Sequence, residues 1–145
     1  MTERMDYGKA SPEALAAMLK VHDYVENCGL ERSLIELVKI RASQINGCAF
    51  CLAMHMKDAR KAGESERRLD LLPAWHEASC FSARERAALA WCESLTLVAE
   101  SRVPDDVWHE ARGQFSEEEL MKLTMVVVVI NGWNRICVGF RSEPE

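Results

Sequence analysis

Two cysteines and a histidine near residue 50 are the residues of this sequence best suited to chemistry. Cys48 and Cys51 are three residues apart, and His55 follows four residues after the second cysteine. A Cys-x-x-Cys pair can close into a disulfide across one helical turn and be reduced again, so it can take up and return electrons. An imidazole beside a thiol can accept its proton and produce the reactive thiolate. The spacing therefore predicts redox catalysis by Cys48, Cys51 and His55.

The sequence around this stretch predicts that the three side chains share one face of a helix. Asn46-Gly47 is a helix-stop signal, and the segment 48–62 contains no proline or glycine and is rich in helix formers. At about 100° per residue, His55 returns to nearly the azimuth of Cys48, and Cys51 lies about 60° away. A thiol at a helix N-terminus is also favoured as the thiolate by the helix dipole.

A carboxylate on the preceding segment completes the candidate site. Glu36 lies twelve positions before Cys48, on a helix that the apolar periodicity predicts from about 31 to 46. Because the two helices are joined by a very short turn, we expect a tight hairpin that brings Glu36 near Cys51 and His55. There it would orient the imidazole or stabilise its charge. The predicted catalytic residues are therefore Cys48, Cys51, His55 and Glu36.

The remaining sequence predicts an all-α, single-domain bundle of about six helices over residues 1–145, with residues 1–10 as a loose lead-in. Ser11-Pro12 is a typical helix start, with Ser as N-cap and Pro at the first helical position. Ser-x-x-Glu capping boxes begin helices at Ser82 and Ser116. The other predicted boundaries are a stop at Cys28-Gly29, a short helix at 65–72, an end near Glu100 for the Ser82 helix, and a helix from Pro104 to about Gly113.

The segment 126–130 is the weakest part of this prediction. Four valines and an isoleucine prefer strands by intrinsic propensity. We predict helix instead, because the capping box at Ser116 precedes the segment and no partner strand occurs elsewhere in the sequence. Since a helix that is apolar all round must be buried, we expect it to lie at a subunit interface of an obligate homo-oligomer.

Composition excludes several classes of function. The net charge of −5 and the pI near 5.5 argue against nucleic-acid binding. The polar N-terminus does not resemble a signal peptide, and the longest apolar run, 125–130, is too short to span a bilayer. We therefore expect a cytoplasmic protein without membrane contact, in which the other cysteines are small buried hydrophobes: Cys28, Cys80, Cys92 and Cys137.

The Glu-x11-Cys-x-x-Cys-x-x-x-His pattern of Glu36, Cys48, Cys51 and His55 resembles that of alkylhydroperoxidase D-like (AhpD-like) proteins in the carboxymuconolactone decarboxylase superfamily. The resemblance is best over about 31–63, and segment 130–135 is also similar to a recurring tail of the small members. It implies an all-α fold that assembles as trimers or hexamers. It implies that the cysteine pair reduces a small hydroperoxide, with Glu36 and His55 as a proton relay and a thiol as reductant. One position departs from the pattern: Phe50 stands where the mycobacterial-type enzyme has a further catalytic histidine.

Two alternatives remain open at this point. Two cysteines, a histidine and a carboxylate can complete a tetrahedral zinc site, which would make the chain a non-enzymatic zinc-binding module. A lyase or hydrolytic activity of the decarboxylase type is the other, although the decarboxylases of the superfamily act on a lactone acid without this cysteine pair. We expect no cofactor and no metal. The sequence does not identify the peroxide, the reductant or the attacking cysteine.

Overall fold

A computed structural model describes residues 1–144, and over this range the chain forms helices and no strands. The all-α prediction is confirmed, although the described range holds more helices than the six expected. They are α1 (Tyr7–Ala10), α2 (Pro12–Glu26), α3 (Arg32–Asn46), α4 (Ala49–Lys61), α5 (Glu66–Leu71), the 3₁₀ helix η1 (Leu72–Ala74), α6 (Ala83–Thr96), α7 (Val98–Ser101), α8 (Asp105–Gln114) and α9 (Glu117–Phe140).

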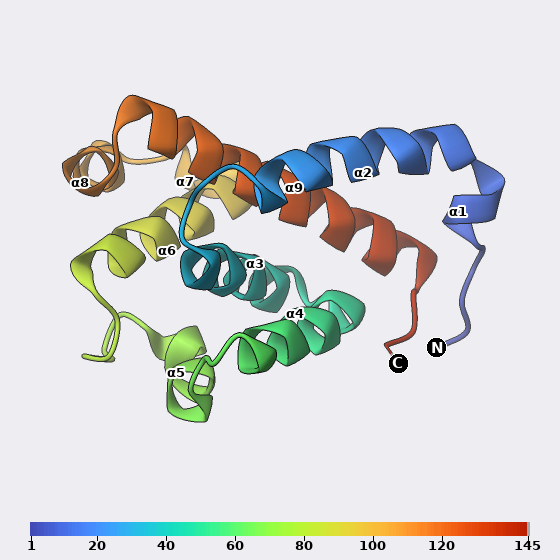
Figure 1. The fold of residues 1–145 in the computed structure, drawn as a ribbon, viewed down its shortest axis with the longest axis horizontal. Coiled ribbons are helices and arrows are strands. Elements are labelled where there is room, and N and C mark those ends of the chain that lie inside the picture. Colours follow the sequence, from blue (N-terminus) through green and yellow to red (C-terminus); the bar gives the residue numbers. More distant parts are fainter. Residues whose placement is uncertain (145) are drawn as a thin grey trace.

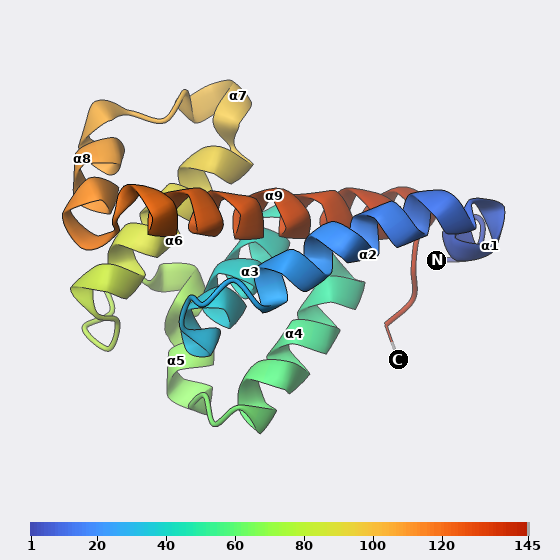
Figure 2. The same ribbon diagram turned by 45° about the horizontal axis from the view of Figure 1, so that its top comes forward.

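The long helix α9 runs through the molecule, and the other main helices pack around it (Figures 1 and 2). Helix α3 contacts α9, α4 and α6, while α2 lies along α9 and carries α1 at its far end. The polypeptide returns to the same region at both ends, so residues near the N- and C-termini lie close to the start of α4 (Figure 1). The turn between α3 and α4 is therefore enclosed by segments that are distant in sequence.

The valine-rich segment is helical, as predicted, and lies in the core of the chain itself. Val126, Val127, Val129 and Ile130 are at most 2% exposed, whereas Val128 is 54% exposed. Because α9 packs against α2, α3, α4, α6 and α8 at once, this chain covers most of the segment itself. The subunit interface expected at this segment stays a prediction. Helix α9 is long and apolar enough to cross a membrane by length and composition alone; in this fold it is the central core helix.

The predicted helix starts agree with the caps in the structure. Ser11 accepts a hydrogen bond from the backbone N–H of Ala14, and the capping boxes at Ser82 and Ser116 are both formed. Each box satisfies backbone donors that the first helical turn leaves unpaired. Local sequence chemistry thus sets these three boundaries without help from tertiary packing.

Two other boundaries differ from the prediction. Residues 1–10 are not wholly loose, because Asp6 caps the short helix α1 by accepting from the backbone N–H of Lys9. The helix that begins at Ser82 does not continue to Glu100. It ends at Thr96 with Leu97 as its C-cap, and the short helix α7 follows directly. The Ser101 hydroxyl donates to the carbonyl of Ser94, one of the carbonyls freed at the end of α6.

The turn between α3 and α4 follows the predicted stop signal. Gly47 has a φ of 65°, the left-handed conformation that glycine adopts without a steric penalty. The backbone N–H of Cys48 then donates to the carbonyl of Ser43 at 3.0 Å, which closes the end of α3. Cys48 itself is the N-cap of α4 rather than its first helical residue. The turn thus places a thiol at the open end of a helix.

Candidate active site

The two cysteines of the motif are held together by the start of α4. The Cys48 Sγ accepts a hydrogen bond from the backbone N–H of Cys51 at 3.3 Å, so the sulfur takes the place that a serine or aspartate oxygen usually has in an N-cap. Both cysteines are 1% exposed. They are free thiols in this structure. A sulfur in this position is stabilised as the thiolate by the N–H donor and by the helix dipole.

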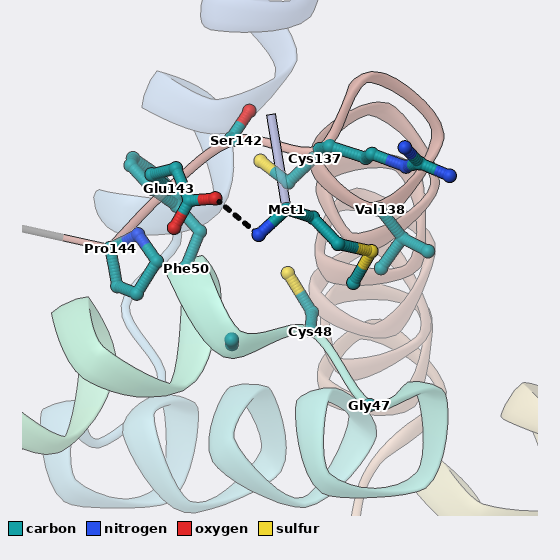
Figure 3. A pocket seen from close by; sticks show the side chains of 11 residues that line it. Met1, Gly47, Cys48, Phe50, Cys137, Val138, Ser142, Glu143 and Pro144 are labelled. Carbon is teal, nitrogen blue, oxygen red and sulfur yellow. Dashed lines mark ion pairs between the residues drawn. The ribbon is translucent and has the colours of Figure 1, made fainter. Parts of the chain in front are cut away.

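A third sulfur completes the cluster. Cys137, on the last turn of α9, brings its Sγ within 4.8 Å of those of Cys48 and Cys51. Figure 3 shows the Cys48 and Cys137 side chains extending toward each other from α4 and α9. Cys137 is buried, as the sequence predicted, but it is not only a packing residue because it contacts both thiols of the motif.

The pKa values of the three thiols are shifted in different directions. Hydrogen bonds from Cys137 and then from Cys51 lower the pKa of Cys48 to about 3, and the Asn134 amide adds to this effect. The pKa of Cys51 is raised, because Cys137 and Cys48 are hydrogen-bonded to it and burial disfavours its charged form. The pKa of Cys137 is also raised, chiefly by its hydrogen bond with Cys48. The arrangement therefore favours one thiolate, on Cys48, with two thiols that donate to it.

Glu36 and His55 meet as the predicted hairpin requires. The Glu36 Oε2 lies 3.2 Å from the His55 Nδ1, and both residues are at most 4% exposed. This contact fixes which nitrogen of the imidazole faces the carboxylate. Within the described residues, the hydrogen bond of the His55 ring is to Glu36 and not to either cysteine of the motif. A direct His55–Cys51 hydrogen bond is therefore absent from residues 1–144, although both side chains line the same cavity.

A network of charged side chains, in which Lys39 is buried and Arg32 is half-exposed, lies behind Glu36. Arg32 Nη2 is 3.1 Å from the Glu36 Oε1, and Arg32 also pairs with Glu26. Glu26 in turn pairs with Lys39, whose side chain is 1% exposed. Two carboxylates and two cations thus compensate each other, which a buried charged group requires. In this network Arg32 faces one carboxylate oxygen of Glu36, and the His55 imidazole faces the other.

Three amides and a hydroxyl fix the hairpin turn to α9. Asn46 donates to the Oδ1 of Asn134 at 2.9 Å and to that of Asn131 at 3.0 Å. Asn134 donates to the Ser43 hydroxyl at 3.0 Å. Its observed role is to join the end of α3 to α9, beside Cys48.

Two cavities open onto the sulfur cluster from different sides. The larger one, of about 600 Å³, is lined by Cys51, His55 and Lys39 on one wall and by α1 and α2 on the other. The smaller one, of about 180 Å³, is lined by Cys48 and by the terminal segments (Figure 3). Cys137 and Phe50 line both. Phe50, which replaces the additional histidine of the resembled pattern, therefore gives the site an apolar wall rather than a third proton carrier.

The larger cavity has an apolar lining with a few unpaired polar atoms. Its apolar walls include Leu15, Leu19 and Met54. His22, Trp133 and Ser142 line the same space, and the buried Nδ1, Nε1 and Oγ atoms of these residues have no hydrogen-bond partner within residues 1–144. Burial lowers the pKa of His22, so its imidazole is held neutral. These groups can donate to, or accept from, an oxygen of a bound molecule.

Sequence reasoning missed Cys137, Lys39, Glu26 and His22. Each is isolated along the chain from the cysteine motif and reaches the site only through the packing of α2, α3 and α9. Only Lys39 could have been predicted from the sequence. It lies three residues after Glu36, so the two share the face of α3 that the predicted hairpin turns toward α4.

The sequence comparisons identify the family. The profile of the Carboxymuconolactone decarboxylase family matches residues 12–94, which include all of α2, α3 and α4. The chain belongs to this family. It is 42% identical to the uncharacterized protein YdfG of Bacillus subtilis (strain 168), over 99% of this chain and 97% of that protein.

Solved structures place the chain among the AhpD-like members of the carboxymuconolactone decarboxylase family. A crystal structure from Agrobacterium tumefaciens, of a protein of unknown function described as a candidate antioxidant defence protein AhpD, has a TM-score of 0.97 at 46% identity and covers 99% of both chains. An uncharacterized peroxidase-related protein from Silicibacter sp. TM1040 has a TM-score of 0.82 at 19% identity, over 93% of this chain and 72% of that one. The second likeness concerns the fold alone. The fold of this carboxymuconolactone decarboxylase family member is thus one that peroxidase-related proteins share.

Proposed function

We propose that this chain is a thiol-dependent hydroperoxide reductase that uses Cys48 and Cys51 as its redox pair. The observation that carries the proposal is the buried sulfur at the N-cap of α4, which accepts the Cys51 N–H at 3.3 Å and has its pKa lowered to about 3. A permanent thiolate is the nucleophile that peroxide reduction needs. The position of Cys51 one turn further provides the second thiol.

The residues suggest a division of roles. The Cys48 thiolate attacks the peroxide oxygen, the O–O bond breaks, and Cys48 becomes a sulfenic acid while the departing alkoxide takes up a proton to become an alcohol. The Cys51 thiol then attacks the Cys48 sulfur, which forms the disulfide and releases water. Because burial and thiol contacts raise the pKa of Cys51, this second step needs a base. His55 lines the same cavity and is held by Glu36, so it can take the Cys51 proton through a bridging water and return it to the leaving hydroxide.

The cycle closes when a dithiol reduces the Cys48–Cys51 disulfide. The dithiol transfers two electrons, becomes a disulfide itself and restores Cys48 as thiolate and Cys51 as thiol. We expect the apolar group of the substrate to lie in the larger cavity, with its peroxide oxygens directed past Phe50 and Cys137, which line both cavities, toward Cys48 in the smaller one. An organic hydroperoxide has both groups.

The test is a peroxidase assay with cumene hydroperoxide and with hydrogen peroxide, using dithiothreitol as reductant. We expect turnover by the wild type and none by Cys48→Ser, with Cys80→Ser as a matched control because Cys80 lies outside the sulfur cluster. The proposal also requires that peroxide consume two thiols per chain and link residues 48 and 51. Equal activity of Cys48→Ser and the control would reject it.

A thiolate metal site is the second candidate function. The zinc set left open as an alternative comprised Cys48, Cys51, His55 and Glu36, whereas the donor atoms that converge within residues 1–144 are three sulfurs and exclude His55 and Glu36. Cys48, Cys51 and Cys137 could instead hold a soft cation such as Zn²⁺ or Cu⁺. Metal analysis of protein purified without chelator separates the two candidates, since a stoichiometric metal would occupy the sulfurs that peroxide must oxidise.

A further inference from the structure

The third sulfur has a position that packing alone does not explain. Cys137 lies on α9, yet its Sγ is within 4.8 Å of both Cys48 and Cys51. A disulfide has an S–S length of about 2.05 Å, so either bond requires the sulfurs to close by roughly 3 Å or less. Side-chain rotation and small shifts of the helix ends supply movements of this size. Cys48 therefore has two thiols within reach and not one.

Each of the two cavities is lined by a different pair of the three cysteines. The larger cavity touches Cys51 and not Cys48, the smaller cavity touches Cys48 and not Cys51, and Cys137 is the sulfur that both cavities share. Figure 3 shows Cys137 facing Cys48 across the smaller cavity. A disulfide between Cys48 and Cys137 would leave Cys51 as a free thiol in the larger cavity, beside His55.

We propose that Cys137 is a second resolving thiol, which forms a disulfide with Cys48 in exchange with Cys51. This inference rests on the proposed function, in which Cys48 is the cysteine that peroxide oxidises. When Cys48 is a sulfenic acid, the Cys137 thiol attacks its sulfur, the S–O bond breaks and water leaves. When the Cys48–Cys51 disulfide is already formed, the Cys137 thiolate attacks the Cys48 sulfur, the old S–S bond breaks, and Cys51 leaves and takes up the proton that Cys137 lost.

The exchange needs no further oxidant, because one disulfide replaces another. The exchange moves the disulfide from one pair of cysteines in the cluster to another. In the Cys48–Cys51 form the disulfide lies within α4, and in the Cys48–Cys137 form it joins α4 to α9. The second form has a thiol and a disulfide at once, with the thiol facing the larger cavity. A reductant that enters by the smaller cavity can then reduce the Cys48–Cys137 bond without entering the larger one.

The proposal is tested by disulfide mapping of Cys51→Ser after treatment with one equivalent of hydrogen peroxide. We expect peptides that contain residues 48 and 137 to be linked, and sulfenic acid trapping by dimedone to be low. The double variant Cys51→Ser/Cys137→Ser should have no link and strong dimedone labelling at Cys48. The matched control is Cys51→Ser/Cys92→Ser, which should keep the 48–137 link, since Cys92 is fully buried and donates to the Val38 carbonyl away from the cluster.

A second oxidant keeps this test independent of peroxidase activity. Diamide oxidises neighbouring thiols to disulfides without a sulfenic acid, so it should produce the 48–137 link in Cys51→Ser even if the chain reduces no peroxide. In wild-type protein the same treatment should give a mixture of 48–51 and 48–137 links. The proposal is overturned if diamide-treated Cys51→Ser, shown to be folded by circular dichroism, keeps Cys137 free or links it elsewhere. It is likewise overturned if the wild type contains the 48–51 link alone under both oxidants. Peroxide failure with diamide success would reject the proposed function and leave the thiol exchange intact.

Discussion

Glu36 and His55 face each other across the α3–α4 hairpin, with the Oε2 and Nδ1 atoms 3.2 Å apart and both side chains buried. The other carboxylate oxygen of Glu36 faces the Arg32 guanidinium at 3.1 Å. The carboxylate is thus positioned from one side by a cation and positions an imidazole on the other. In the proposed mechanism, Glu36 therefore orients the imidazole, and His55 transfers the proton.

The first prediction uses this difference between the two roles. His55→Gln should slow disulfide formation after peroxide by about 10²–10⁴-fold, the loss expected of a general base, and Glu36→Gln should slow it less, because it removes only the group that orients the base. The measurement is rapid-quench thiol counting across pH 5–9. Glu13→Gln is the control, since Glu13 is exposed on α2. Identical profiles for all four proteins would mean that Glu36 and His55 take no part in the step.

The second prediction concerns pH and the attacking thiol. Because the pKa of Cys48 is lowered to about 3, the thiolate is present above that pH. The alkylation rate of Cys48 by iodoacetamide should therefore be nearly flat from pH 5 to 9 and fall only below. Cys137→Ala removes the largest contribution to this lowering, so the pKa should rise and the rate should become pH-dependent. The measurement is site-resolved mass spectrometry of alkylated protein. A wild-type rate that increases tenfold per pH unit up to pH 8 would contradict the assignment of the thiolate to Cys48.

The third prediction concerns the amides that join the hairpin to α9. Asn134→Ala removes one acceptor of the part-buried Asn46 amide and one donor to the buried Ser43 hydroxyl, and although each keeps another partner, the change should cost about 1–3 kcal/mol. The change should also raise the pKa of Cys48, because the Asn134 amide contributes to its lowering. Urea unfolding and iodoacetamide kinetics measure the two effects. Asn27→Ala, whose lost hydrogen bond to Asp23 is exposed, is the control and should change neither appreciably.

The fourth prediction compares two glycines. Gly47→Ala forces an alanine to adopt a φ of 65° with no atom within 4 Å of the added Cβ, so the cost is conformational, about 1–2 kcal/mol. Gly113 is inside α8 with ordinary helical geometry and equally open space. Gly113→Ala should therefore stabilise the protein by about 0.5–1 kcal/mol. Thermal unfolding measures both, and a stabilising Gly47→Ala would show that the turn does not hold the left-handed conformation.

The fifth prediction concerns the expected homo-oligomer and the exposed apolar residues of α9. Val128 and Met121 are 54% and 59% exposed and lie seven residues apart on one face of α9. If the homo-oligomer forms through α9, Val128→Lys should lower the mass measured by light scattering at micromolar concentration. Val98→Lys is the control, because Val98 is 51% exposed on α7. A wild-type monomer, or an assembly that both variants leave intact, would exclude this face.

Sequence reasoning worked best where the chemistry is local. Serine N-caps and the Gly47 stop signal gave correct helix boundaries, and the hairpin they define was sufficient to predict that Glu36 meets His55. It failed at the end of the Ser82 helix, because no local signal marks the break at Leu97 between α6 and α7. It also assigned Cys137 only to the core, because no local pattern indicates that the last turn of α9 packs against the first turn of α4.

Two groups of helices supply the residues that line the larger cavity. The thiols, His55 and Lys39 belong to α3, α4 and α9, whereas much of the opposite wall belongs to α1 and α2, of which α1 packs on α2 and α2 packs on α9. Substitutions in residues 3–22 can therefore reshape what enters without altering the geometry that reacts. The residues proposed to react and many of the residues that shape the cavity therefore lie in separate stretches of the sequence, which can change independently of each other.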